Sequence, residues 1–158
     1  MSEAVLSARV RGSVGEIAAA QWDALAGGGN PFLSHAFLTA LEESGSVDRL
    51  GEGRAGATGW QAAPIVLEDD AGRLVGALPS YIKGHSQGEY VFDHAWADAW
   101  HRAGGHYYPK LQIAVPFTPA TGPRLLLAQD RFAAPLLRAA EQVCAQSGLS
   151  SAHATFIE

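Results

Sequence analysis

The turn at residues 69–72 is the feature that most constrains how this 158-residue chain folds. Its sequence, Asp-Asp-Ala-Gly, joins two apolar segments, 62–68 and 73–83. Asp and Gly tolerate the positive φ angles of tight hairpin turns, so the pattern predicts two antiparallel strands. Pro79 lies within the second segment. Because proline has no amide hydrogen for the strand ladder, we expect a sheet edge or a bulge there.

Helical patterns flank this hairpin. Ser13 and Ser34 each precede an apolar helical pattern, and their hydroxyls can cap the first turn. After the hairpin, a short helix is predicted over 93–103 and a long helix between Asp130 and Gly148. Further strands are predicted over 4–11, 111–115, 122–127 and 152–157, whereas 45–59 reads as a loop.

The order of these elements is β-α-α-β-β-(α)-β-α-β. It indicates an α/β domain in which a mixed sheet is flanked by helices. The segment 122–127 is expected to resume the strand 111–115 after a proline-bounded loop. The length allows one domain with a sizeable core, so residues 1–158 are expected to form a single domain. The stop on strand 152–157 suggests that a longer protein was cut there.

Composition excludes several classes of protein. The net charge is −5 and no Lys/Arg run is present, which disfavours DNA binding. No segment approaches the roughly 20 apolar residues of a membrane span, and the N-terminus is not a secretory signal. A cytoplasmic location is therefore expected. Cys144 is the only cysteine, which excludes an intrachain disulfide, and it falls on the apolar stripe of the last helix.

Aromatic and titratable residues concentrate in the window 89–124. It holds three of the six histidines, two of the four tryptophans and three of the four tyrosines. Ligand pockets combine apolar walls with a few placed polar groups, so this window is the predicted site.

One face of the predicted helix 93–103 carries His94, Asp98 and His101, and the opposite face carries Trp96 and Trp100. The tryptophans are expected to face the core. His94 and His101 lie about 10.5 Å apart along the axis, so only neighbouring pairs could share an ion. Two ligands make no metal site by themselves, and none is expected. A substrate-facing surface and a merely solvated face both remain open.

Three further groups of residues carry possible binding chemistry. Asp93 is expected to cap the helix. The run 106–110 could hold a polar acceptor molecule or simply plug a helix-to-strand junction. The loop 116–124 is stiffened by prolines, and its donors Thr118, Thr121 and Arg124 could contact a carboxylate or phosphate. No P-loop and no Gly-x-Ser-x-Gly elbow is present in the sequence.

Three long runs resemble a known family. They are NPFLSHAFLTALEESGSV (30–47), LVGALPSYIKGHSQGEYVFDHAWADAWHRAGG (74–105) and YYPKLQIAVPFTPATGPRLL (107–126). These runs resemble the FemAB-like predicted N-acyltransferases, a GNAT-related family of peptidoglycan biosynthesis or recognition. The resemblance implies a GNAT-like domain that transfers an acyl or aminoacyl group from acyl-CoA or aminoacyl-tRNA to a small-molecule or peptide amine. Family chains carry two such halves, and this chain resembles the N-terminal one.

The resemblance also implies candidate roles. An acyltransferase of EC class 2.3, completed by a second half, needs a proton acceptor and groups that hold its substrates. The candidate proton acceptors are His94 and Asp98. The candidate substrate-binding residues are Asp93, His101, Tyr107, Tyr108, Lys110, Thr118, Thr121 and Arg124.

Two other functions remain open. The chain could be a non-catalytic binding or scaffold domain that recognises a peptidoglycan-type ligand. It could also recreate the two-half cleft by pairing with itself or with a second GNAT-like half.

Overall fold

The computed structural model describes residues 5–51 and 57–158. Residue 4 of the predicted first strand and residues 52–56 of the predicted loop lie outside the described residues. The helices are α1 (Ala19–Ala26), α2 (His35–Glu43), α3 (His94–Arg102) and α4 (Ala133–Ser147), with 3-10 helices η1 (Val14–Glu16), η2 (Pro31–Leu33) and η3 (Asp130–Phe132).

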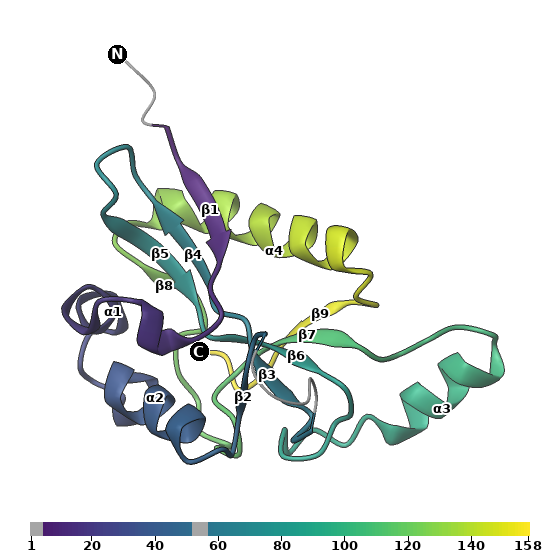
Figure 1. Ribbon diagram of the computed structural model, residues 1–158. Helices are drawn as coiled ribbons and strands as arrows, with labels where there is room; N and C mark the ends of the chain where they lie inside the picture. The colour runs from purple at the N-terminus through teal and green to yellow at the C-terminus, as the bar shows by residue number, and fades with distance from the viewer. Residues whose placement is uncertain (1–4, 52–56) are drawn as a thin grey trace.

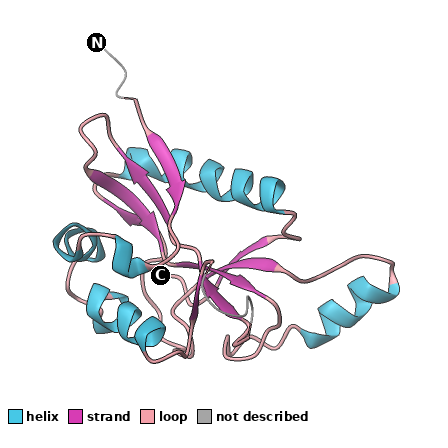
Figure 2. Cartoon of the chain, viewed as in Figure 1, coloured by secondary structure: helices cyan, strands magenta, loops and turns pink. Residues whose placement is uncertain are grey.

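The strands form two sheets, which Figures 1 and 2 show in the same view. The first sheet contains, in spatial order, β1 (Ser7–Val10), β4 (Ile65–Glu68), β5 (Leu74–Leu78) and β8 (Leu126–Leu127). The second contains, in order, β2 (Asp48–Arg49), β3 (Trp60–Ala62), β6 (Ser80–Lys83), β7 (Lys110–Ile113) and β9 (Ala152–Ala154). The predicted α/β class is confirmed, but the strands divide between two sheets, where one mixed sheet was expected.

The predicted hairpin is confirmed, and it explains the division into two sheets. β4 and β5 pair antiparallel on either side of the 69–72 turn, and β3 and β6 continue the same ribbon into the second sheet. The ribbon changes sheet at Pro64 on one strand and Pro79 on the other. Neither proline can donate to a ladder, so the regular pairing is interrupted at both. A hydrogen bond from Ser80 Oγ to the Ala63 carbonyl, 2.7 Å long, spans the gap.

Helices cover both faces of the first sheet. α1 packs on β5 and β8, whereas α4 packs on β1, β4 and β5. Along β4 the side chains alternate: Val66 joins the core beneath α1 with Trp22, and Leu67 joins the core beneath α4 with Leu136. This alternation is the period of two that a strand buried on both faces requires.

The sequence had suggested that the segment 122–127 resumes the strand β7. The structure shows that it does not. Its paired part, β8, joins β5 in the first sheet. The last strand, β9, pairs instead with β7, parallel to it and in register with Gln112 opposite His153. The chain between β7 and β8 therefore crosses from one sheet to the other, and the long helix α4 brings it back.

The helix boundaries show which caps were interpreted correctly. Ser34 caps α2 by accepting from the Phe37 amide at 3.2 Å, as predicted. Ser13 caps only the 3-10 turn η1, and α1 begins later, at Ala19. α4 begins at Ala133, after a 3-10 turn at Asp130, and ends at Gly148 in the left-handed conformation.

In the part of the chain that the structure describes, no helix is long and apolar enough to cross a membrane.

Helix α3 stands apart from the two sheets, at the right of Figure 1. None of its residues, all of which are described, is buried. The expectation that its tryptophans face the core is wrong: Trp96 is 74% exposed and Trp100 is 56% exposed. Trp100 lies instead against Gly105, where a Cβ atom would come within 2.3 Å of its Nε1. Trp96 and Trp100 both line a surface pocket.

Candidate functional site

A buried ion-pair cluster lies where β7 begins. Lys110 Nζ is 2.9 Å from Glu89 Oε2 and 2.8 Å from Asp93 Oδ2, and the Lys110 side chain is 1% exposed. The Tyr107 hydroxyl donates to the same Asp93 oxygen at 2.6 Å. Two carboxylates thus share one ammonium group, an arrangement that compensates the cost of removing these charges from water.

Asp93 occupies the N-cap position of α3 but makes no side-chain cap hydrogen bond. The predicted capping role of its carboxylate is therefore wrong. The carboxylate turns instead to Lys110 and Tyr107, which are stronger partners than a helix amide because one of them is charged. Within the described residues, Asp93 Oδ1 and Glu89 Oε1 are buried and have no hydrogen-bond partner.

The pKa values of the two carboxylates are shifted in opposite directions. Burial raises the pKa of Glu89, although Lys110 opposes the rise. Burial acts in the same direction on Asp93, but the hydrogen bonds from Lys110 and Tyr107, together with the nearby Ser86 hydroxyl, outweigh it and lower the pKa of Asp93 to about 2. Asp93 is therefore a firmly ionised group at neutral pH and a poor proton acceptor.

A second lysine lies close by in a different environment. Lys83 is fully buried, and its Nζ donates to the Gln87 carbonyl at 3.0 Å and lies 3.7 Å from the centroid of the Trp60 ring. Burial lowers the pKa of Lys83 to about 7, with Lys110 acting in the same direction and Glu89 and Asp93 opposing it.

An aromatic pocket of about 430 Å³ adjoins the cluster. Its lining residues come from α3, the approach to β7 and the β9 region: Val91, Asp93, Trp96, Trp100, Tyr107, Ser150, Ser151 and His153. Asp93 and Tyr107 belong to both the cluster and the pocket. The arrangement combines ring faces with one buried carboxylate, which suits a ligand that carries an amine.

The structure brings together four of the sequence-predicted residues: Asp93, Tyr107, Tyr108 and Lys110. Tyr108 is in edge-to-face contact with Tyr107, at a centroid distance of 5.0 Å, and its hydroxyl hydrogen-bonds Ser86. The common location of these residues was predicted from their shared sequence window. The partners Ser86 and Glu89 were not singled out, because an isolated Ser or Glu has no pattern that distinguishes a buried group from a solvated one.

The other candidates from helix 93–103 lie outside the pocket lining. His94, Asp98 and His101 are all on exposed parts of α3. Among residues 5–51 and 57–158, no three His, Cys, Asp or Glu side chains are grouped so that they could hold a metal ion. The roles of His94 and Asp98 as proton acceptors stay predictions.

Thr118 and Thr121 lie near the crossing between the sheets, apart from the pocket lining. The Thr118 hydroxyl donates to the Pro116 carbonyl at 3.0 Å, and the exposed Thr121 accepts from Asn30 Nδ2 through its carbonyl at 3.1 Å. The structure does not test the prediction that Thr118 and Thr121 contact an anionic group.

Arg124 is buried in the same crossing and donates from every guanidinium nitrogen. Its Nε reaches the Thr155 carbonyl at 2.8 Å and its Nη2 reaches the Ala120 carbonyl at 2.7 Å. Nη1 lies 3.3 Å from the carbonyls of Gly122 and Pro123. The guanidinium therefore ties the last segment of the chain to the 116–124 loop. Its predicted contact with an anion stays a prediction.

Replacing Arg124 by lysine is expected to lower the free energy of unfolding by about 1–3 kcal/mol. A lysine ammonium cannot reproduce the planar fork that contacts four carbonyls, so some of these buried acceptors lose their partners. Urea unfolding followed by circular dichroism measures the change. The exposed Arg102→Lys is the matched control and should change stability by less than about 0.5 kcal/mol. Equal stability of Arg124→Lys and the natural chain would contradict the anchoring role.

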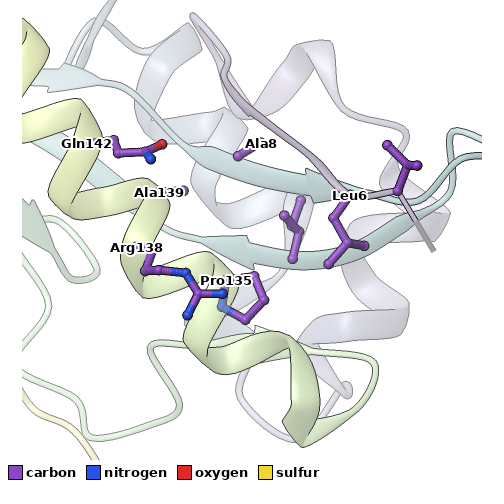
Figure 3. Close-up of a pocket in the computed structure, with 8 residues that line it drawn as sticks. Leu6, Ala8, Pro135, Arg138, Ala139 and Gln142 are labelled. Atoms are coloured by element: carbon purple, nitrogen blue, oxygen red, sulfur yellow. The ribbon is translucent and has the colours of Figure 1, made fainter. Parts of the chain in front are cut away.

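A second hollow, shown in Figure 3, lies between β1 and α4. It has a volume of about 620 Å³, and its labelled lining residues include Leu6, Pro135, Arg138 and Gln142. None of the residues of the Lys110 cluster lines it, and among its described lining residues Arg138 is the only charged one. The aromatic pocket is the better candidate site, because it alone of the two includes a buried carboxylate with an unpaired oxygen.

Comparison with known proteins supplies one match. A family model described as FemAB-like, peptidoglycan biosynthesis/recognition, matches residues 13–158. No curated protein and no solved structure matches the chain. The matched range includes every residue of the Lys110 cluster and of the aromatic pocket.

Proposed function

Because this chain belongs to the FemAB-like family of peptidoglycan biosynthesis or recognition, we propose that it binds the amine acceptor of an N-acyl transfer reaction. Completed by a second GNAT-like half, it catalyses transfer of an acyl or aminoacyl group to that amine. Acyl-CoA and aminoacyl-tRNA are the proposed donors. The acceptor is a small molecule or peptide of cell-wall precursor metabolism.

The observation that carries this proposal is the unpaired oxygen of Asp93 in the wall of the aromatic pocket. Asp93 Oδ1 is buried without a partner among the described residues, while Oδ2 is held by Lys110 and Tyr107. A ligand ammonium that donates to Oδ1 would satisfy it with a charge-assisted hydrogen bond. The rings of Trp96 and Trp100 can add cation–π attraction or stack on a sugar ring.

Asp93→Asn is expected to weaken binding of a muropeptide that carries a free amine by about 10- to 100-fold, because the loss of the anion removes a charge-assisted hydrogen bond. Isothermal titration calorimetry measures the dissociation constant. Trp96→Ala should weaken binding as well, and the exposed position of Trp96 keeps this variant folded.

Two controls sharpen this experiment. Asp70→Asn makes the same substitution in the exposed hairpin turn and should leave binding unchanged. The same muropeptide with its amine acetylated should bind the natural chain and Asp93→Asn equally weakly. Tight binding of the acetylated compound to the natural chain would reject amine recognition by Asp93.

The low pKa of Asp93 favours a second candidate function, a non-catalytic module that recognises a peptidoglycan-type ligand. A permanently ionised carboxylate is well suited to hold a cation and poorly suited to take up a proton. Titration of the full-length protein with acetyl-CoA and with alanyl-tRNA separates the two functions. Binding of the muropeptide and of either donor supports the transferase, whereas binding of the muropeptide alone supports the module.

Pairing with a second GNAT-like half, or of this chain with itself, belongs to the same proposal. Trp96, at the edge of the pocket, leaves 74% of its surface exposed, and Phe92, between the lining residues Val91 and Asp93 in the chain, leaves 85% exposed. Apolar side chains at such a rim favour a covering partner. Sedimentation velocity over a range of concentrations measures self-association directly.

A further inference from the structure

His153 lies in the wall of the aromatic pocket and was not among the residues singled out from the sequence. β9 holds its backbone against β7, opposite Gln112. Its ring is in edge-to-face contact with Tyr107, at a centroid distance of 5.8 Å and an angle of 90°. Its Nε2 is 2.9 Å from Ser151 Oγ, which lines the same pocket. The imidazole is therefore fixed in orientation and open to a ligand.

We propose that His153 accepts the proton that the acceptor amine releases during acyl transfer. This inference rests on the proposed function. Tyr107 connects Asp93 with His153, because its hydroxyl donates a hydrogen bond to Asp93 and its ring contacts the His153 ring. An acceptor nitrogen held at Asp93 would therefore lie in the same pocket as the imidazole.

The bonds and protons of the transfer step balance when His153 is the proton acceptor. The ammonium held at Asp93 first releases one proton to solvent. The lone pair of the resulting neutral amine then attacks the carbonyl carbon of the donor, so a C–N bond forms and the C–S or C–O bond to the carrier breaks. The nitrogen loses a proton to the unprotonated ring nitrogen of His153. The departing thiolate or alkoxide then takes up this proton, which returns the imidazole to its neutral form.

The charged groups around His153 suit it to this role. Burial lowers its pKa, the nearby Lys110 ammonium acts in the same direction, and Asp93 opposes them. Tyr107 and Ser151 are the uncharged polar neighbours. The lowered pKa favours the neutral imidazole, which can accept a proton, whereas Asp93 stays ionised.

The test replaces His153 by glutamine in the full-length protein. Transfer is assayed with the free-amine muropeptide as acceptor and acetyl-CoA or alanyl-tRNA as donor. We expect kcat to fall by about 100-fold or more, while the dissociation constant of the muropeptide changes less than about twofold. The natural rate should fall on the acid side of its pH profile for two reasons, protonation of the acceptor amine and protonation of His153. Only the part caused by His153 should be absent from the variant. His106→Gln is the matched control, since His106 is exposed and lies outside the pocket lining.

A second measurement needs no catalytic activity. The imidazole resonances of His153, assigned by their loss in His153→Gln, are followed by NMR during titration with the muropeptide. The free-amine compound should shift them, and the acetylated compound should not. Unshifted His153 resonances during Asp93-dependent binding would overturn the proposal.

The remaining outcomes separate this inference from the proposed function. Transfer that survives His153→Gln but falls in His94→Ala or Asp98→Asn would place the proton acceptor on α3 and overturn the inference alone. Muropeptide binding without transfer from either donor would establish the binding module. It would also overturn the role of His153 as proton acceptor. A natural full-length protein that neither binds the muropeptide nor transfers to it would overturn both the proposed function and the role of His153.

Discussion

Lys110→Met is expected to destabilise the folded chain by about 3–5 kcal/mol. The ammonium of Lys110 is the shared partner of Glu89 and Asp93, and all three side chains are more than nine-tenths buried. Methionine fills a similar volume but leaves two carboxylates in a poorly solvated site without their cation. Urea unfolding at pH 7, monitored by circular dichroism, measures the loss.

A compensated variant separates charge from packing in this experiment. Glu89→Gln and Asp93→Asn, added to Lys110→Met, remove the two uncompensated charges and should recover at least half of the lost stability. A fully additive loss in the triple variant would mean that packing around the lysine stem, and not the ion pairs, stabilises the site. A loss of less than about 1 kcal/mol for Lys110→Met alone would show that the pairs contribute little.

Lys83→Met is expected to have the opposite effect and to raise the free energy of unfolding at pH 6 by several kcal/mol. Burial lowers the pKa of Lys83 from 10.5 to about 7, so folding at pH 6 removes a charged ammonium from water without a direct carboxylate partner. Methionine avoids that cost. The Gln87 carbonyl keeps a donor in the variant, because Trp60 Nε1 also bonds it at 3.1 Å.

The pH dependence identifies the cause of this effect. Below pH 7 Lys83 is charged in both the folded and the unfolded chain, and folding carries the full desolvation cost. As pH rises from 7 towards 10.5 the folded chain releases its proton first, so the free energy of unfolding increases by at most about 1.4 kcal/mol per pH unit. Measurements between pH 7 and 8.5 avoid tyrosine ionisation. The increase should be absent in Lys83→Met, and its persistence there would assign it to another group.

The two buried lysines differ through their neighbours. Lys110 contacts two carboxylates directly, whereas Lys83 contacts a carbonyl and an aromatic ring. The sequence places both residues at strand ends, where a lysine is usually solvated. Only the arrangement of β6 beside β7, with Lys83 opposite Lys110 in register, shows that both are buried.

Much of the local structure was predictable because it depends on short-range physics. The hairpin at 69–72, the cap at Ser34 and the end of α4 at Gly148 follow from turn and capping chemistry within a few residues. The division into two sheets was missed, because the effect of Pro79 on the ladder depends on Pro64 in the paired strand.

The residues of the candidate site were likewise predictable only in part. The window 89–124 contains Asp93, Tyr107 and Lys110, and the structure brings these three into contact. The sequence contained no sign of His153, which reaches the pocket only because β9 pairs with β7 after the long excursion through α4. The direction of the α3 tryptophans was also misjudged, since periodicity predicts which residues share a face but not what covers that face.

By itself, then, the sequence determined the α/β class, the family and the segment that contributes most of the pocket. These depend on local patterns of polarity, turn residues and long matching runs. The tertiary structure alone decided which charges are buried, which carboxylate oxygens lack a partner among the described residues and which histidine enters the pocket. The physical reason is that burial and pairing are set by contacts between residues far apart in the chain, and such contacts leave no local pattern.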